Sequence, residues 1–420
     1  MATAEPIATD PRAPAVRLHR PESAADVAAV LAAASAAGTP VSLIGHGAHA
    51  AIGRPAGDAD RLDLSALSGI TLHEPEELVL SARAGTPVAD IIARLADRGQ
   101  HLACEVPDFA ALLGTPPGRG TLGGLVATNL CGPRRLTAGS IRDAVLGVEA
   151  VTGAGEIFKA GGRVVKNVTG FDLPRLFAGS WGSLVVLTEI TLKVTPAPES
   201  ELTLAFSGLD DTRALALMTR AMSAGVDVAA AAHLPATAAR TLPAGAAGAL
   251  TLLRLEGIAV SVAARAERLI RLLAADGAPA RVIAPASAAL WQAVRDVTPF
   301  ARERDRPVWR VSLAPTRGAA FAAAVAAAVP GTEALYDWAG GLVWLQLPAD
   351  APDAGAEAVR TALAAAGGGH ATLIRADADT RTRLAVFQPR SAGVAALEAR
   401  VKDRFDPARI LERGRVITFA

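Results

Sequence analysis

Apolar positions in the first half of the chain change repeatedly between helical and strand spacing. Between Ser23, the expected N-cap, and Gly38, the expected stop, they recur every three to four residues, as on one face of a helix. A short apolar strand over 41–44 follows, and 78–83 alternates like a half-buried strand before a helix that ends at Gly99. This mixture of helices and strands excludes a simple helical bundle.

Further along, the pattern predicts a hairpin and then a long strand. Residues 144–151 and 156–159 are two strands joined by a Thr-Gly-Ala-Gly turn, and 184–194 is a strand with one apolar face. Pro196 and Pro198 then interrupt the pattern, which indicates a domain boundary.

After residue 200 strands and helices alternate. The pattern predicts strands at 203–206, 250–256, 309–313, 342–347 and 371–375, and helices at 211–223, 260–273, 318–329 and 356–366. We interpret them as two β-α-β units that share one sheet, which makes a ferredoxin-like α+β domain.

The composition is that of a globular protein without a strong charge. The chain has 420 residues, 51% of them hydrophobic and 20% charged, with a net charge of +1. The charge balance argues against a nucleic-acid partner, and the longest small-apolar stretch, 318–329, is too short to span a membrane. Two cysteines cannot form a disulfide framework or ligate an iron–sulfur cluster alone. The first 14 residues lack a secretory signal, and we expect them to be disordered.

A glycine-rich hexapeptide, Gly-His-Gly-Ala-His-Ala, follows the first strand at 45–50. It formally fits the dinucleotide fingerprint, but that fingerprint must open a helix, and Gly53, Pro55 and Gly57 prevent one here. The loop either cradles a phosphate with its backbone amides or is a plain surface turn.

Two more glycine-rich runs lie at 120–124 and 179–183. We expect 107–124 to be irregular, with the Gly-Gly pair allowing a ligand to touch the backbone. Thr128 and Asn129 supply polar side chains beside it.

Four strings give these runs a family context. They are Thr-Leu-Gly-Gly-Leu-Val-Ala at 121–127, Gly-Pro-Arg-Arg at 132–135, Ser-Ile-Arg-Asp-Ala-Val-Leu-Gly at 140–147 and Lys-Asn-Val-Thr-Gly-Phe-Asp-Leu at 166–173. In order and content the chain resembles the FAD-binding domain shared by vanillyl-alcohol oxidase and p-cresol methylhydroxylase. Within that superfamily it is most similar to the FAD-binding subunit of the bacterial glycolate oxidase complex.

The resemblance implies an α+β fold with a two-subdomain FAD-binding domain of the p-cresol methylhydroxylase type, followed by the ferredoxin-like cap. We expect the FAD-binding domain over 15–198, the cap over 199–376 and a C-terminal helical segment over 377–420 that returns to the FAD-binding domain.

The resemblance also implies which positions contact FAD. They are Gly45, His46, Gly47, Ala48, His49, Thr121, Gly123, Gly124, Thr128, Asn129, Gly132, Arg134, Gly139, Ser140, Asp143, Gly182 and Val186.

Some of these positions keep another interpretation. Gly139 and Gly182 could serve only turns, Val186 only the core, and Arg134 only the surface. His49 could bond the flavin covalently, donate a hydrogen bond to flavin or phosphate, or be solvated; we expect non-covalent FAD.

Lys166 could lie near the isoalloxazine or form a structural ion pair. Glu412 and Arg413 replace the Asn-Pro usual near the end of this family, which leaves a C-terminal contact with the flavin in doubt.

Catalytic residues remain unassigned. Related 2-hydroxy-acid dehydrogenases carry closely spaced histidines that bind a divalent metal, whereas this cap contains only His233 and His370, so we expect no metal site. His370 and Arg375 are the remaining candidates for catalysis or carboxylate binding.

The resemblance implies oxidation of glycolate, a small 2-hydroxy acid, to glyoxylate, with electrons passing through the flavin to iron–sulfur centres on a partner. It implies two partner chains, a sister FAD subunit that carries the metal and an iron–sulfur subunit. Whether this chain or its sister takes the hydride stays open. The alternatives are a self-sufficient dehydrogenase for another acid such as D-lactate, and a non-catalytic structural subunit. We expect a cytoplasmic protein; peripheral attachment to the inner membrane through the complex is left open.

Overall fold

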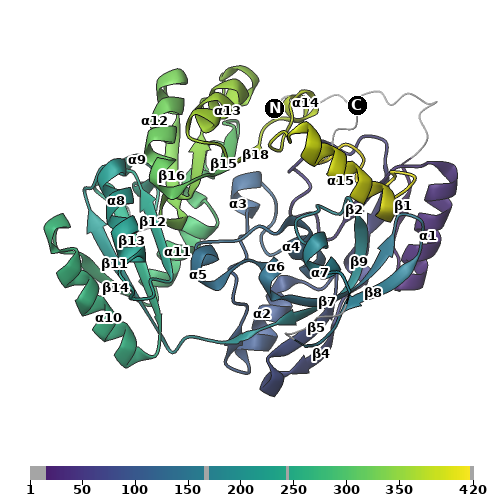
Figure 1. The fold of residues 1–420 in the computed structure, drawn as a ribbon, viewed down its shortest axis with the longest axis horizontal. Helices are drawn as coiled ribbons and strands as arrows, with labels where there is room; N and C mark the ends of the chain where they lie inside the picture. The colour runs from purple at the N-terminus through teal and green to yellow at the C-terminus, as the bar shows by residue number, and fades with distance from the viewer. Residues whose placement is uncertain (1–15, 165–169, 243–245, 417–420) are drawn as a thin grey trace, which may run out of the picture.

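A computed structural model describes residues 16–164, 170–242 and 246–416. They form two lobes that lie side by side, with the N-terminal half in one and the cap in the other (Figure 1). The expected disorder over 1–14 and the position of Lys166 lie outside the described residues.

The first lobe begins with a small α/β subdomain. Its elements are β1 (Leu18–His19), α1 (Ala24–Ala37), β2 (Val41–Ile44) and β3 (Asp60–Asp63). The strands form a parallel sheet in the order β1-β3-β2. As predicted, Ser23 and Asp26 form a capping box at the start of α1, and Gly38 ends it in the left-handed conformation at φ 66°. Val27 and Leu31 bury the inner face of the helix.

A five-stranded antiparallel sheet makes the second subdomain. Its order is β4 (Ile70–Glu74), β5 (Val79–Arg83), β9 (Val185–Lys193), β7 (Val145–Thr152) and β8 (Ile157–Gly161). Helices α2 (Val88–Ala96), α4 (Leu122–Thr128) and α7 (Leu173–Phe177) accompany it. The expectation of irregular structure throughout 107–124 was wrong, because α3 (Ala110–Leu113) forms there and α4 begins at Leu122. Thr121 caps α4, and this compensates for the two glycines in its first turn.

The cap is one eight-stranded antiparallel sheet built from two ferredoxin-like units. The first unit is β11 (Ser200–Ser207), α8 (Asp211–Met222), β12 (Ala230–Leu234), β13 (Leu250–Gly257), α10 (Ala259–Leu272) and β14 (Ala280–Ile283). The second is β15 (Val308–Ser312), α12 (Gly318–Ala328), β16 (Glu333–Asp337), β17 (Leu342–Gln346), α13 (Ala356–Ala365) and β18 (His370–Arg375). The sheet order β14-β11-β13-β12-β16-β17-β15-β18 joins the two units through β12 and β16.

The ferredoxin-like architecture is therefore confirmed, but the sequence predicted too few strands. It missed β12, β14 and β16. All five residues of β12 are buried, so the strand has no polar alternation, and β14 is a mostly exposed edge.

The last segment returns from the cap to the first lobe. Helix α15 (Ala392–Phe405) lies along that lobe (Figure 1), and Leu411 then pairs in parallel with Val41 of β2. This pairing places residues 411–416 beside the loop that follows β2. Within the described residues, no helix is both long and apolar enough to cross a membrane.

Candidate functional site

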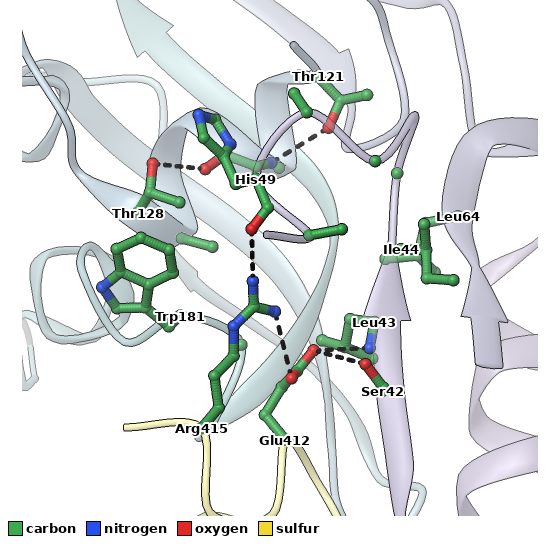
Figure 2. A pocket seen from close by; sticks show the side chains of 18 of the residues that line it. Ser42, Leu43, Ile44, His49, Leu64, Thr121, Thr128, Trp181, Glu412 and Arg415 are labelled. Carbon is green, nitrogen blue, oxygen red and sulfur yellow. Dashed lines mark hydrogen bonds and ion pairs between the residues drawn. The ribbon is translucent and has the colours of Figure 1, made fainter. Parts of the chain in front are cut away.

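A cavity of about 440 Å³ opens where four separate segments of the first lobe meet. Most of its lining comes from the end of β2 with the loop after it, from α4, from the run before β9, and from the C-terminal residues Glu412 and Arg415 (Figure 2). The volume lies within the range of about 300–1,000 Å³ that small-molecule sites occupy.

The loop after β2 packs directly against the start of α4. A Cβ at Gly45 would lie 2.7 Å from Thr121 Oγ1, so only glycine allows this approach. Thr121 Oγ1 in turn accepts from Gly124 N at 3.2 Å. At position 47 there is room for a side chain, since nothing lies within 4 Å of a Cβ placed there. Glycine is favoured there because the backbone is left-handed, with φ 79°.

A second glycine, Gly123, allows helix α4 to pack closely against the end of β5. Gly123 N donates to Ala84 O at 2.7 Å, and a Cβ at Gly123 would lie 2.9 Å from that of Ala84. Thr128 Oγ1 donates to Gly124 O at 2.9 Å. Small residues thus leave one side of α4 open to the cavity.

The third segment, at 180–182, contacts both β2 and α4. A Cβ at Gly182 would lie 2.7 Å from Leu43 Cδ1, and Gly182 itself has φ 75°. Trp181 N donates to Ala127 O at 2.8 Å, which fixes this run on α4.

The C-terminal residues Glu412 and Arg415 hold β2 and the glycine-rich loop that follows it. Glu412 accepts from Leu43 N at 2.7 Å, and its second oxygen lies 3.2 Å from Arg415 Nη1. Arg415 Nη2 donates to the His49 carbonyl at 2.9 Å, and the guanidinium lies 5.5 Å from the Trp181 ring (Figure 2). Sequence reasoning left a C-terminal contribution in doubt, because the Glu-Arg pair differs from the family pattern; the structure places Glu412 in the cavity wall.

The cavity has a positive lining that suits a diphosphate. Among the described residues that line it, the arginines are Arg54, Arg61, Arg119, Arg381 and Arg415, and the carboxylate is Glu412. Burial, with a smaller contribution from Arg415, lowers the pKa of His49 to about 4, so that His49 is neutral at neutral pH.

Ten of the positions expected to contact FAD line this cavity. They are Gly45, His46, Gly47, Ala48, His49, Thr121, Gly123, Gly124, Thr128 and Gly182. No sequence pattern pointed to the arginines or to Trp181, because they come from widely separated parts of the chain.

Other expected positions serve local structure outside the cavity lining. Asn129 ends α4 in the left-handed conformation and accepts from Arg142 N at 3.3 Å. Ser140 and Asp143 form the capping box of α6 (Ile141–Ala144). Val186 is fully buried in the core.

Of the remaining expected positions, Arg134 and Gly132 contact the cap, and Gly139 lies beside Asp143 of the first lobe. Arg134 pairs with Glu256 at 2.8 Å in a separate cleft. Gly132 packs against Arg295, where a Cβ would lie 2.8 Å from its Cγ. Gly139 has φ 78° and its Cβ would lie 2.8 Å from Asp143 Oδ2.

Neither cap candidate for catalysis reaches the cavity. Arg375 is buried and donates to four backbone carbonyls, among them Leu112 O at 3.0 Å and Glu303 O at 2.7 Å. Burial lowers its pKa to about 10. His370 is exposed, with Nδ1 3.3 Å from Arg390.

Comparison with known proteins agrees with this geometry. Residues 16–161 match the FAD binding domain family. Glycolate oxidase subunit GlcE of Escherichia coli (strain K12) is 34% identical over 385 residues, which covers 90% of this chain and 93% of that protein. D-lactate dehydrogenase of Archaeoglobus fulgidus is 33% identical, but over only 42% of this chain and 38% of that protein.

Solved structures share the fold at low identity. The p-cresol methylhydroxylase structure has a TM-score of 0.70 at 15% identity and covers 95% of this chain and 88% of that one. The 4-ethylphenol oxidase of Gulosibacter chungangensis has the same TM-score at 13% identity, with 95% and 89% covered.

The match with the FAD binding domain family defines an FAD-dependent oxidoreductase, and its fold is the one seen in the p-cresol methylhydroxylase structure. Within that class, the chain belongs to the family of glycolate oxidase FAD-binding subunits to which GlcE belongs.

Proposed function

We propose that this chain is the FAD-binding subunit of a complex that oxidises glycolate to glyoxylate. The observation that carries the proposal is the junction of the four segments around one arginine-lined cavity, in a chain that matches GlcE over nearly its whole length. The match with D-lactate dehydrogenase covers less than half of either chain, so it supports the chemistry of a 2-hydroxy acid more than lactate itself.

The backbone amides of 45–49 and the arginines around them would hold the diphosphate of FAD, because the small residues there permit close approach. When bound, FAD supplies the electron acceptor for the oxidation of a CH–OH group. Arg415 keeps the loop in place through the His49 carbonyl, and neutral His49 is a hydrogen-bonding partner for the cofactor rather than a cation. We propose that FAD binding is non-covalent.

Electrons would leave through an iron–sulfur subunit, beside a sister FAD subunit. The two cysteines of this chain are both buried, and burial raises the pKa of Cys104 to about 12, which disfavours the thiolate that a cluster needs. The name "glycolate oxidase subunit" of the relative supports assembly with partners. We place the complex in the cytoplasm, with any membrane attachment made by partner subunits.

The test is to purify the chain alone and together with its co-expressed partners. We expect a flavin absorption spectrum from the chain alone, yellow colour in the supernatant after acid precipitation, and glycolate oxidation by the assembled complex. A colourless chain that takes up no added FAD would contradict the proposal. Turnover of glycolate or D-lactate by the chain alone, with an artificial acceptor, would favour the self-sufficient dehydrogenase.

A further inference from the structure

A charged side chain with no hydrogen-bond acceptor among the described residues lies between the lobes, outside the cavity described above. Arg310 of β15 lies on the sheet face that packs against the first lobe. Its guanidinium carbon lies 4.9 Å from the Trp338 ring and 6.0 Å from the Trp344 ring. Its Nε is buried without a hydrogen-bond partner among the described residues.

The terminal nitrogens of this guanidinium differ from its Nε in their exposure. The side chain as a whole stays partly exposed, although Nε is buried. In the described part of the chain no carboxylate or carbonyl accepts from its terminal nitrogens, and unlike Nε these nitrogens are not fully buried.

Other buried arginines of the cap have protein acceptors. Arg254 lies 2.8 Å from Glu105 and 2.9 Å from Glu256, and Arg375 donates to backbone carbonyls. A cation that is largely buried and has no counter-charge is costly, so the contrast with Arg310 calls for an anion from outside the chain.

The titratable groups near Arg310 do not supply that anion at neutral pH. They are Cys131, Asp337 and Arg135. Burial raises the pKa of Asp337 to about 8 and raises the pKa of the Cys131 thiol, so both are predominantly neutral at pH 7. Arg135 adds a second positive charge.

The location connects Arg310 with the flavin-binding lobe. Trp338 Nε1 donates to Gly132 O at 3.0 Å, and the ring of Trp344 meets the ring of Phe109 at 5.4 Å. Gly132 comes four residues after Thr128, which lines the FAD cavity. The guanidinium is therefore held where the cap meets the segment that leads out of the cofactor site.

We propose that Arg310 binds the carboxylate of a small 2-hydroxy acid in the space between the cap and the FAD-binding lobe, with Trp338 and Trp344 holding the guanidinium plane. A planar guanidinium suits a carboxylate because two parallel N–H···O bonds can form, and the indole faces stabilise the cation without consuming its donors. This proposal rests on the proposed function, and it names a substrate contact within this chain rather than only in a sister subunit.

Oxalate is the probe, because it carries the carboxylate and cannot donate a hydride. Isothermal titration calorimetry of the FAD-loaded chain should detect oxalate binding, with glycolate as competitor. Arg310→Gln should weaken oxalate binding at least tenfold and leave the FAD content unchanged. Arg310→Lys, which keeps the charge but not the fork of donors, should fall between the two.

Arg360→Gln is the matched control. Arg360 also lies over an indole, 5.6 Å from the Trp309 ring, and its Nε also lacks a partner, but it donates to Ala385 O. Trp309 points into the core on the opposite face of β15, so this variant should bind oxalate like the wild type.

Absence of oxalate binding by the FAD-loaded wild type, or equal binding by Arg310→Gln and wild type, would overturn the proposal while FAD binding still stood. Where Arg310→Gln does not fold, as judged by circular dichroism, unchanged binding by Arg310→Lys would overturn it. A chain that binds no FAD would instead refute the proposed function.

Discussion

Lys402 of α15 connects the C-terminal segment to the FAD cavity. Its side chain is 2% exposed, and its ammonium lies 2.5 Å from Asp406 Oδ2, whose side chain is fully buried. It also donates to Ser183 O at 2.6 Å and to Leu411 O at 2.8 Å. Burial lowers the pKa of Lys402 although Asp406 faces it. We expect Lys402→Met to destabilise the protein and to weaken FAD binding together.

The size of the expected loss of stability follows from the fate of Asp406 once the lysine is removed. Methionine fills a similar volume but leaves Asp406 buried without its cation, and removing one partner of such a pair costs about 3–5 kcal/mol. In a unit of about 200 residues this corresponds to a decrease in Tm of roughly 6–20 °C. FAD affinity should decrease at least tenfold, because Glu412 and Arg415 follow Leu411 directly into the cavity wall.

Thermal unfolding by circular dichroism measures the first effect and flavin fluorescence titration the second. Lys159→Met is the matched control, since Lys159 is 76% exposed and lies 3.3 Å from Glu149. Such surface pairs contribute about 0–1 kcal/mol, so the control should change neither quantity appreciably. Equal stability of Lys402→Met and Lys159→Met, or a destabilised Lys402→Met with unchanged FAD affinity, would refute the reasoning.

Three further predictions concern the site and the cap. Because the pKa of His49 is about 4 when folded and 6.5 when unfolded, the apo chain should lose stability as the pH falls from 6.5 towards 4. His49→Gln should make the free energy of unfolding, measured with urea, depend less on pH in this range. An unchanged pH dependence would contradict the burial of neutral His49. Gly45→Ala places a Cβ 2.7 Å from Thr121 Oγ1 and should weaken FAD binding at least tenfold by fluorescence titration. Gly393→Ala, in α15 with nothing within 4 Å of the added Cβ, should leave the FAD affinity unchanged; similar affinities of the two variants would argue against close packing of the loop. Arg375→Gln should lower the free energy of unfolding by about 2–3 kcal/mol, because buried carbonyls lose their donor. Glycolate-dependent reduction of the flavin in the complex should stay unchanged. A variant that is as stable as the wild type but no longer reduces its flavin would show that Arg375 acts in the active site.

Local features of this protein could be predicted from sequence because neighbouring residues decide them. Ser23 and Gly38 mark the ends of α1 through side-chain capping and a left-handed backbone, both of which act within one turn. The run of glycine and proline after β2 likewise excluded a helix, and the loop is indeed not helical. The glycine-rich strings identified the family because cofactor contacts that use the backbone require glycine in the sequence itself.

Tertiary structure alone decided which distant residues meet. The pairing of Leu411 with Val41 brings Glu412 and Arg415 to the cofactor loop, and nothing in the pattern of either segment encodes that pairing. Strand β12 was missed because a strand buried on both faces lacks alternation. Arg310 could not be singled out from the sequence either, because whether an arginine has a hydrogen-bond acceptor depends on the groups that surround it in the folded chain. Helix caps and glycine loops depend on contacts a few residues apart, whereas cavities and uncompensated charges depend on contacts made by segments hundreds of residues apart.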